Sequence, residues 1–170
     1  MTQLAGQQVA ELAYAAGFRN TGGSEDLTTA VALAAVMSGW RPNAHAVTSD
    51  EDSRGLWGIN VYAYPQYRDV NLYNPKVSAV VAYSVYTGAG RSFNPWSAYL
   101  YGRHQQYAAA ARAAVRAIAQ SGGYLPPLSA SGEAPWTGTR YIRDSALQLD
   151  GTTARLKYRT SQVSTMRGAK

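Results

Sequence analysis

The chain has 170 residues, a net charge of +6 and 46% hydrophobic residues, which fits one globular domain with an additional segment. It contains no cysteine and only two histidines, His45 and His104, so disulfides and zinc sites are not expected, and neither is another metal or a cofactor. No apolar run reaches the roughly 20 residues that span a bilayer. Residues 1–16 lack the pattern of a secretory signal, so the sequence predicts neither a membrane segment nor a signal peptide.

Helical periodicity is clear in the first third of the chain. Apolar residues recur at helical spacing over residues 4–16. A second helix is predicted over residues 27–38, with Ser24 or Asp26 as its N-cap and Gly39 as its C-cap. This second helix is apolar on nearly every side, which predicts a buried central helix.

The next eighty residues alternate between loops and helices. Residues 40–55 are polar and are predicted to form a loop, while residues 56–64 are aromatic-rich and partly extended. Asn74-Pro75 and Asn94-Pro95 both pair a capping side chain with a proline, a pattern typical of helix starts. We therefore expect helices over residues 76–87 and from Asn94 to about residue 101, and a third, alanine-rich helix over residues 105–120.

The C-terminal segment has a different character. Residues 124–138 contain three prolines and two glycines, and no periodicity follows apart from short extended stretches at 146–149 and 155–158. A division is predicted between residues 1–122, a folded domain, and residues 123–170, an extended and largely irregular arm that becomes ordered only on a partner.

Positive charge is concentrated towards this arm. Residues 1–120 hold nine basic and seven acidic side chains, a net +2, whereas residues 121–170 hold seven and three, a net +4. Nonspecific attraction could bring such a segment to an anionic wall polymer or a nucleic acid. The alternative is a solvated tail that binds nothing through its charge. A nucleic-acid partner is not what we expect.

Two short motifs carry the functional information. Residues 35–40 read Ala-Val-Met-Ser-Gly-Trp, and residues 55–60 read Gly-Leu-Trp-Gly-Ile-Asn. Together they resemble the signature segments of lysozyme-like soluble lytic glycosidases of the phage and actinobacterial type. In that family the helix ends in Glu-Ser-Gly and the second motif reads Gly-Leu-(Trp/Phe)-Gln-Ile-Asn. Further ordered pieces at residues 41–44, 74–75 and 93–99 extend the resemblance over about residues 9–115.

The resemblance implies a mainly α-helical domain with a cleft for β-1,4-linked aminosugar chains of peptidoglycan. The candidate cleft residues are Met37, Ser38, Trp57, Gly58, Asn60, Trp96 and Tyr99. Aromatic faces stack well on sugars. The alternative for each aromatic is that it packs in the core, where most large aromatics lie.

The family's catalytic positions are altered in this chain. Met37 stands where the family has its glutamate, and a thioether cannot donate the proton that glycosidic cleavage requires. Gly58 replaces a glutamine and so removes an amide. The run Asp50-Glu51-Asp52 contains a candidate substitute acid, Glu51. The alternative interpretation is that these three acids form an exposed, solvated loop with no catalytic role. The sequence therefore predicts that no catalytic residue is retained.

Three functions follow from the resemblance. The first is a catalytically inactive structural protein of a phage particle, as a minor tail or tail-tip component. It would be made in the host cytoplasm and would bind other virion proteins through residues 123–170, with a homo-oligomer as one form of the assembly. The second is a noncatalytic peptidoglycan-binding module. The third is an active muramidase or lytic transglycosylase that uses Glu51.

Overall fold

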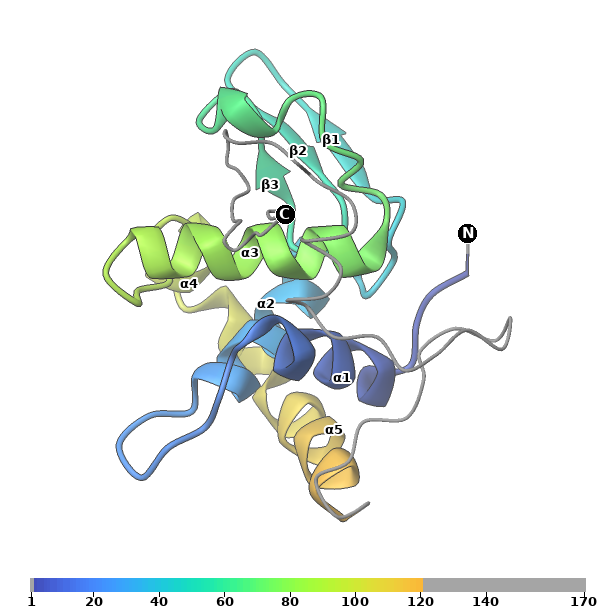
Figure 1. Cartoon of the computed structure of the whole chain (residues 1–170), viewed down its shortest axis with the longest axis vertical. Helices are drawn as coiled ribbons and strands as arrows, with labels where there is room; N and C mark the ends of the chain where they lie inside the picture. Colours follow the sequence, from blue (N-terminus) through green and yellow to red (C-terminus); the bar gives the residue numbers. More distant parts are fainter. Residues whose placement is uncertain (1, 121–170) are drawn as a thin grey trace, which may run out of the picture. The chain divides into compact units, whose positions relative to one another are not determined.

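The computed structural model describes residues 2–120, which belong to the compact unit Met1–Leu128 and are mainly helical (Figure 1). The mainly α fold class is thereby confirmed. The elements in chain order are α1 (Gly6–Ala16), α2 (Asp26–Ser38), β1 (His45–Val47), β2 (Asp52–Arg54), β3 (Ile59–Asn60), η1 (Pro65–Tyr67), α3 (Pro75–Gly88), α4 (Ser97–Leu100), η2 (Arg103–Tyr107) and α5 (Ala108–Gln120). No helix within this range is long and apolar enough to cross a membrane. The predicted arm over 123–170 lies outside the described residues.

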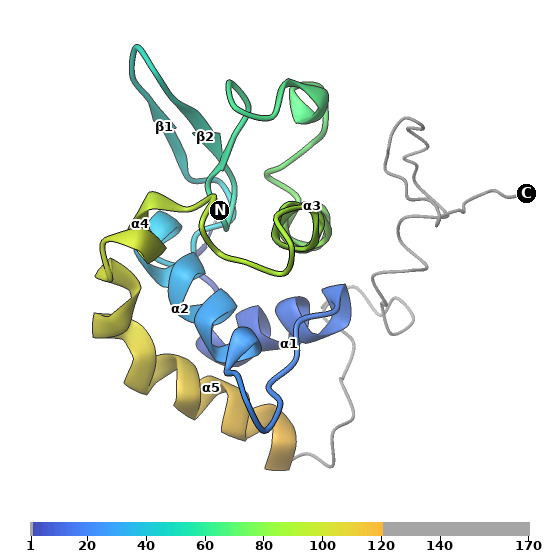
Figure 2. The same cartoon turned by 90° about the vertical axis from the view of Figure 1, so that its left-hand side faces the viewer.

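Helix α2 forms the centre of the domain, as its composition predicts. Nine of its 13 residues are buried. Helices α1, α4 and α5 pack around it, together with η2, and Figure 2 shows α5 and α1 on two different sides of α2. Because neighbours cover it all round, the helix has no polar face, which explains its almost uniformly apolar sequence.

The N-terminus of α2 is capped differently from the prediction. Neither Ser24 nor Asp26 caps it, and the amide oxygen of Asn20 accepts from the backbone N–H of Thr28 at 3.1 Å. The carboxylate of Asp26 instead accepts a hydrogen bond from the hydroxyl of Tyr86, which joins α2 to α3. The prediction is wrong because the turn between α1 and α2 places Asn20, which lies several positions before the helix, beside the first turn of α2. At the other end Gly39 takes the left-handed conformation with φ 61°, as expected for a C-cap.

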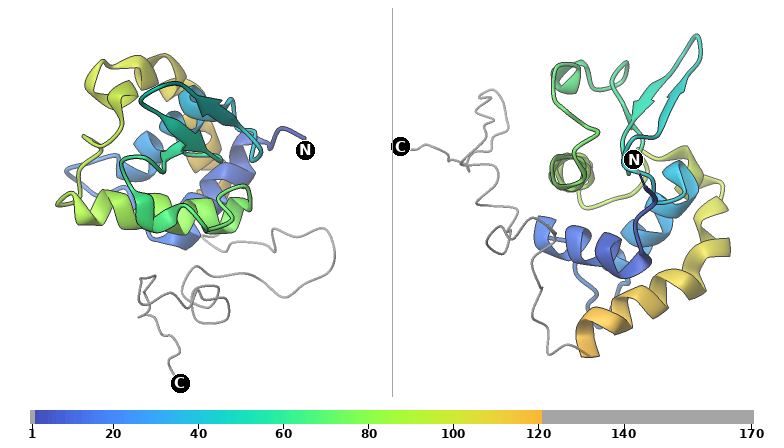
Figure 3. Two further views of the ribbon diagram at one scale, coloured as in Figure 1. Left: turned by 90° about the horizontal axis from the view of Figure 1, so that it is seen from above. Right: turned by 90° about the vertical axis from the view of Figure 1, so that its right-hand side faces the viewer.

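A small antiparallel sheet in the order β1-β2-β3 replaces part of the predicted loop over residues 40–55. Ser53 pairs with Ala46 on one side and with Asn60 on the other. Strands of two or three residues are too short to show a period of two, and β1 is exposed throughout, so composition cannot reveal them. Helix α3 lies between this sheet and α1 (Figure 1 and Figure 3).

The two Asn-Pro pairs differ in the folded protein. The side chain of Asn74 accepts from the backbone N–H groups of Lys76 and Val77 at 2.9 and 3.3 Å, so it caps α3 as predicted. Asn94 does not cap α4, because the chain makes a turn first and the helix begins only at Ser97. The predicted alanine-rich helix is present as α5, preceded by η2.

Candidate functional site

A cleft opens where the C-terminal end of α2 meets the sheet. It consists of two cavities of about 210 and 340 Å³ that share four lining residues, Met37, Glu51, Ser53 and Gly58. We name the smaller cavity the Trp96 arm, which is also lined by Asn60, Tyr64, Val85 and Trp96. We name the larger cavity the Arg41 arm, which is also lined by Ser38, Arg41, His45 and Tyr107. The shared residues make the two arms a single cleft centred on Met37 and Glu51.

Met37 and Gly58 fit together at this centre. Met37 lies half-buried in the last turn of α2, and Gly58 has a left-handed backbone with φ +56°. A Cβ atom built on Gly58 would lie 2.7 Å from Cε and 3.3 Å from Cβ of Met37. The methionine therefore occupies space that a side chain at position 58 would enter. The side chain of Met37 and the absence of a side chain at Gly58 are complementary in shape.

Glu51 lies opposite, in the hairpin, and is half-buried in the wall of both arms. The hydroxyl of Ser53 donates a hydrogen bond to its Oε2 atom. Within residues 2–120, no other carboxylate lines either arm. Of the three adjacent acids, Glu51 alone is placed to contact a ligand in the cleft.

Its two neighbours are engaged elsewhere. Asp52 accepts from Nη2 of Arg54 at 2.6 Å and pairs with Nε2 of His45 at 2.8 Å. The hydrogen bond from Arg54, followed by that from His45, lowers the pKa of Asp52 to about 2, so this carboxyl stays ionised and cannot act as a proton donor near neutral pH. Asp50 is exposed and accepts from the hydroxyl of Ser49.

Ser38 and Asn60 line the cleft, but their side chains also hold the backbone. The hydroxyl of Ser38 donates to the carbonyl of Ala34 at 2.8 Å, one turn back in α2. The amide oxygen of Asn60 accepts from the backbone N–H groups of Asp52 and Tyr62 at 3.1 and 3.0 Å. Asn60 thus connects β2 to the turn after β3, which leaves its amide nitrogen as the group available to a ligand.

The three aromatic candidates have different positions. Trp96 lines its arm of the cleft, although it is only 4% exposed and donates from Nε1 to the carbonyl of Trp57. Trp57 is 1% exposed, donates to the carbonyl of Ala30 at 2.8 Å and lines neither arm. Its placement in the cleft is therefore corrected: Trp57 is a core residue that ties the second motif to α2.

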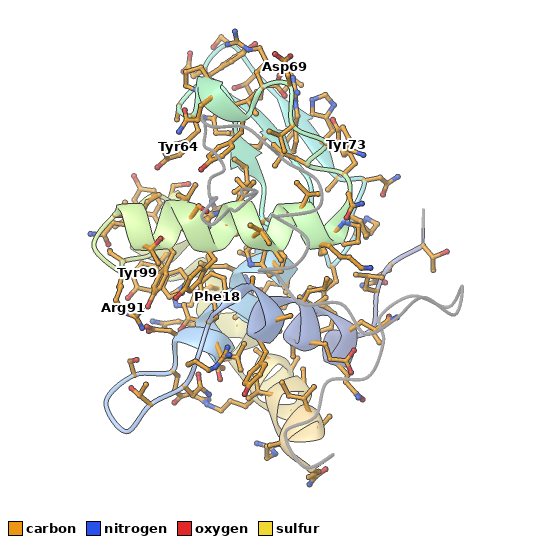
Figure 4. All side chains as sticks on the ribbon, viewed as in Figure 1. Phe18, Tyr64, Asp69, Tyr73, Arg91 and Tyr99 are labelled. Carbon is orange, nitrogen blue, oxygen red and sulfur yellow. The ribbon has the colours of Figure 1, made fainter. Side chains whose placement is uncertain are left out.

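Tyr99 also lies away from the cleft. Its ring stacks on that of His104, with centroids 4.9 Å apart, and lies 5.6 Å from that of Phe93. In the view of Figure 4, Tyr99 lies below α3, whereas Tyr64 lies above it. Tyr99 lines neither arm, because α4 directs it towards η2 and the aromatic core.

Several cleft residues were not predicted from the sequence, among them Tyr64, Arg41 and His45. Tyr64 closes the Trp96 arm, and burial raises the pKa of its phenol. Arg41 and His45 line the other arm. Tyr64 ends the aromatic-rich run after the second motif, and Arg41 follows the first motif directly, so proximity to the motifs was the available signal.

The predicted site residues that line a cavity all lie in this cleft. A larger hollow of about 720 Å³ lies at the opposite end of α2, beside Glu25 and Arg112, and contains none of the predicted site residues. No group of three metal-binding side chains occurs within residues 2–120. The cleft at Met37 is therefore the candidate site.

Comparison with known proteins agrees with this geometry. A family model described as a lysozyme like domain matches residues 10–98, which is more than half of the chain and includes both motifs. Searches of curated proteins and of solved structures found no match. By its sequence match, its central helix and the cleft at the end of that helix, the chain belongs to the lysozyme-like domain family.

Proposed function

We propose that this domain binds an aminosugar chain of the peptidoglycan type in its cleft and does not cleave it. Membership of the lysozyme-like family associates the domain with glycan. The observation that carries the proposal is the position of Met37, which lines both arms of the cleft at the helix end where the family has its acid. The domain would therefore have the glycan cleft of the family without the acid that donates a proton from the helix end.

The chemistry supports inactivity. Most glycosidases use two carboxyl groups, one to protonate the leaving oxygen and one to act as base or nucleophile, whereas some use a group of the substrate as nucleophile and need one acid only. Glu51 is the single carboxylate of the described chain that lines the cleft, and it can serve in one of these roles only. Loss of general acid catalysis alone lowers a rate by roughly 10²–10⁴-fold.

Binding is supported by the lining of the Trp96 arm. Tyr64 and Val85 give it apolar surface beside Trp96, and Asn60 supplies an amide. Aromatic and apolar surface with a few polar groups is typical of a site for small ligands.

A binding assay tests this proposal. The protein should co-sediment with purified cell-wall sacculi, and Tyr64→Ala should weaken binding roughly three- to tenfold through loss of ring contact. Tyr62→Ala is the matched control, since Tyr62 is 48% exposed and lines neither arm. Equal binding by both variants, or no binding by the unmodified protein, would contradict the proposal.

Catalysis is tested with the same sacculi by chromatography of soluble fragments. The unmodified protein should release none, and Met37→Glu should produce measurable release because it restores a carboxylic acid at the helix end. If Met37→Glu binds sacculi and releases nothing, then the absent acid is not what limits cleavage.

Glu51 supports a second candidate, an active muramidase or lytic transglycosylase. It is half-buried in the cleft and held by the hydroxyl of Ser53. Release of fragments by the unmodified protein, lost in Glu51→Gln, would establish this activity and exclude the noncatalytic proposal.

A structural role in a phage particle remains a prediction from the resemblance. It assigns the contacts with other virion proteins to residues 123–170, outside the described part of the chain. Purified particles that contain the protein in a fixed copy number, and that fail to incorporate a chain ending at residue 122, would support it. Absence of the protein from such particles would exclude it.

A further inference from the structure

Arg41 lies against the C-terminal end of α2, beside the centre of the cleft. A Cβ atom built on Gly39 would lie 3.1 Å from Nη1 of Arg41 and 3.3 Å from its Cζ, so the absence of a side chain at Gly39 leaves room for the guanidinium. The last carbonyl groups of a helix carry partial negative charge and favour a cation there. The guanidinium thus lies beside this end of α2, at the wall of the Arg41 arm.

The guanidinium of Arg41 is available to a ligand. Within residues 2–120 it has no ion pair with a carboxylate, whereas Arg54 is paired with Asp52 and Arg112 with Glu25. Arg41 is also exposed. A guanidinium presents a planar set of donors that matches the two oxygens of a carboxylate.

Charge is distributed unequally between the two arms. Arg41 lines the larger arm as a cation, whereas His45, which also lines it, is paired with Asp52. The smaller arm has no basic side chain among its lining residues. Glu51 is common to both, so it does not distinguish them. The Arg41 arm is therefore the better place for an anionic group, and the Trp96 arm suits an uncharged sugar.

We propose that Arg41 is a specificity-determining residue that binds a carboxylate carried by the glycan. Peptidoglycan bears such carboxylates on alternate sugars, either as the free acid or at the end of an attached peptide, whereas chitin is an uncharged chain of the same linkage. The proposal rests on the proposed function and refines it: the cleft prefers the carboxylated chain, with the acidic sugar in the Arg41 arm.

Isothermal titration of the full chain with three ligands tests this inference. They are chitotetraose, a peptidoglycan tetrasaccharide stripped of its peptides, and the same tetrasaccharide with peptides attached. The unmodified protein should bind at least one of the two carboxylated ligands about tenfold more tightly than chitotetraose, since a charge-assisted hydrogen bond replaces an unpaired cation. Arg41→Gln should abolish this preference, whatever its effect on the affinity for chitotetraose.

Arg103→Gln is the matched control, because Arg103 is exposed and lines neither arm. It should keep the preference. Tight binding of the stripped ligand alone assigns the contact to the free acid on the sugar, and tight binding of the peptide-bearing ligand alone assigns it to the peptide; tight binding of both shows that a carboxylate in either position reaches Arg41. Binding of chitotetraose with no preference, or a preference that survives Arg41→Gln, would overturn the inference and leave the proposed function standing. Failure of all three ligands to bind would overturn both.

Discussion

Replacing Gly58 with alanine tests whether Met37 and Gly58 occupy the cleft as a fitted pair. The new Cβ atom would lie 2.7 Å from Cε of Met37 and 3.3 Å from its Cβ. It would also force an L-residue into a left-handed backbone with φ +56°. The variant should therefore unfold more easily than the unmodified protein, for two separable reasons.

The expected loss can be worked out from these two contributions. A left-handed backbone costs a residue with a Cβ atom roughly 1–2 kcal/mol. Moving the flexible end of Met37 away from its rotamer costs about 0.5–1.5 kcal/mol more. Gly58→Ala should thus lower the free energy of unfolding by about 1.5–3.5 kcal/mol.

Gly90→Ala provides the control for the backbone contribution. Gly90 has φ +74°, and a Cβ atom built on it meets nothing within 4 Å. Gly90→Ala should therefore lower the free energy of unfolding by about 1–2 kcal/mol, through the backbone contribution alone. Met37→Ala removes Cε, the atom that the new Cβ would meet. The double variant should therefore lose about 0.5–1.5 kcal/mol less free energy of unfolding than the sum of the losses in the two single variants.

Equilibrium unfolding in urea, followed by tryptophan fluorescence, measures these differences as shifts in midpoint at constant slope. If Gly58→Ala loses no more stability than Gly90→Ala, and if Met37→Ala adds to it without coupling, the two residues are not a fitted pair. The complementarity in shape of Met37 and Gly58 would then have no basis.

Three further stability predictions follow. The arginine and histidine partners of Asp52 lower its pKa from 3.8 to about 2, so its ionised form stabilises the fold above about pH 4 and this contribution is lost as the pH falls from 3.8 to about 2. Asp52→Asn should therefore have a lower urea midpoint than the unmodified protein at pH 7 and an equal one near pH 2. A difference in midpoint that does not change with pH would contradict this, and so would an equal decrease in Asp50→Asn, which alters an exposed carboxylate. Asn74→Ala removes a helix cap and should lower the free energy of unfolding by about 1 kcal/mol. Asn94→Ala should lower it little in the same urea assay, because Asn94 caps no helix. Equal losses in the two variants would contradict the different roles of the two asparagines. The buried hydroxyl of Ser78 has no hydrogen-bond partner within residues 2–120, so Ser78→Ala should leave thermal stability unchanged or raise it by up to about 1 kcal/mol, and a clear loss would show that the hydroxyl is satisfied.

Local signals explain which parts of the fold were predictable. The buried helix α2, the Asn74 cap and the Gly39 C-cap each depend on residues within a few positions of one another. The N-cap of α2 was not predictable, because Asn20 reaches it through the geometry of a turn. The short hairpin from β1 to β2 was missed because its strands are too short for a periodic pattern.

The candidate site was predicted in part. Met37, Gly58 and Glu51 lie together at the centre of the cleft, as the spacing of the motifs implied. Trp57 and Tyr99 do not line it. A tryptophan that packs on a helix and one that faces a sugar have the same sequence pattern, and the direction of each ring is set by the elements that surround it.

The sequence alone determined the mainly helical fold class and the central helix, because both depend on residue type and short-range spacing. The tertiary structure alone decided that Met37 fits against Gly58, that Asp52 is held by Arg54 while Glu51 faces the cleft, and that Arg41 lies at the cleft wall with no carboxylate partner among residues 2–120. These are contacts between side chains that the fold brings together, and short-range patterns in a single sequence do not record which atoms will meet.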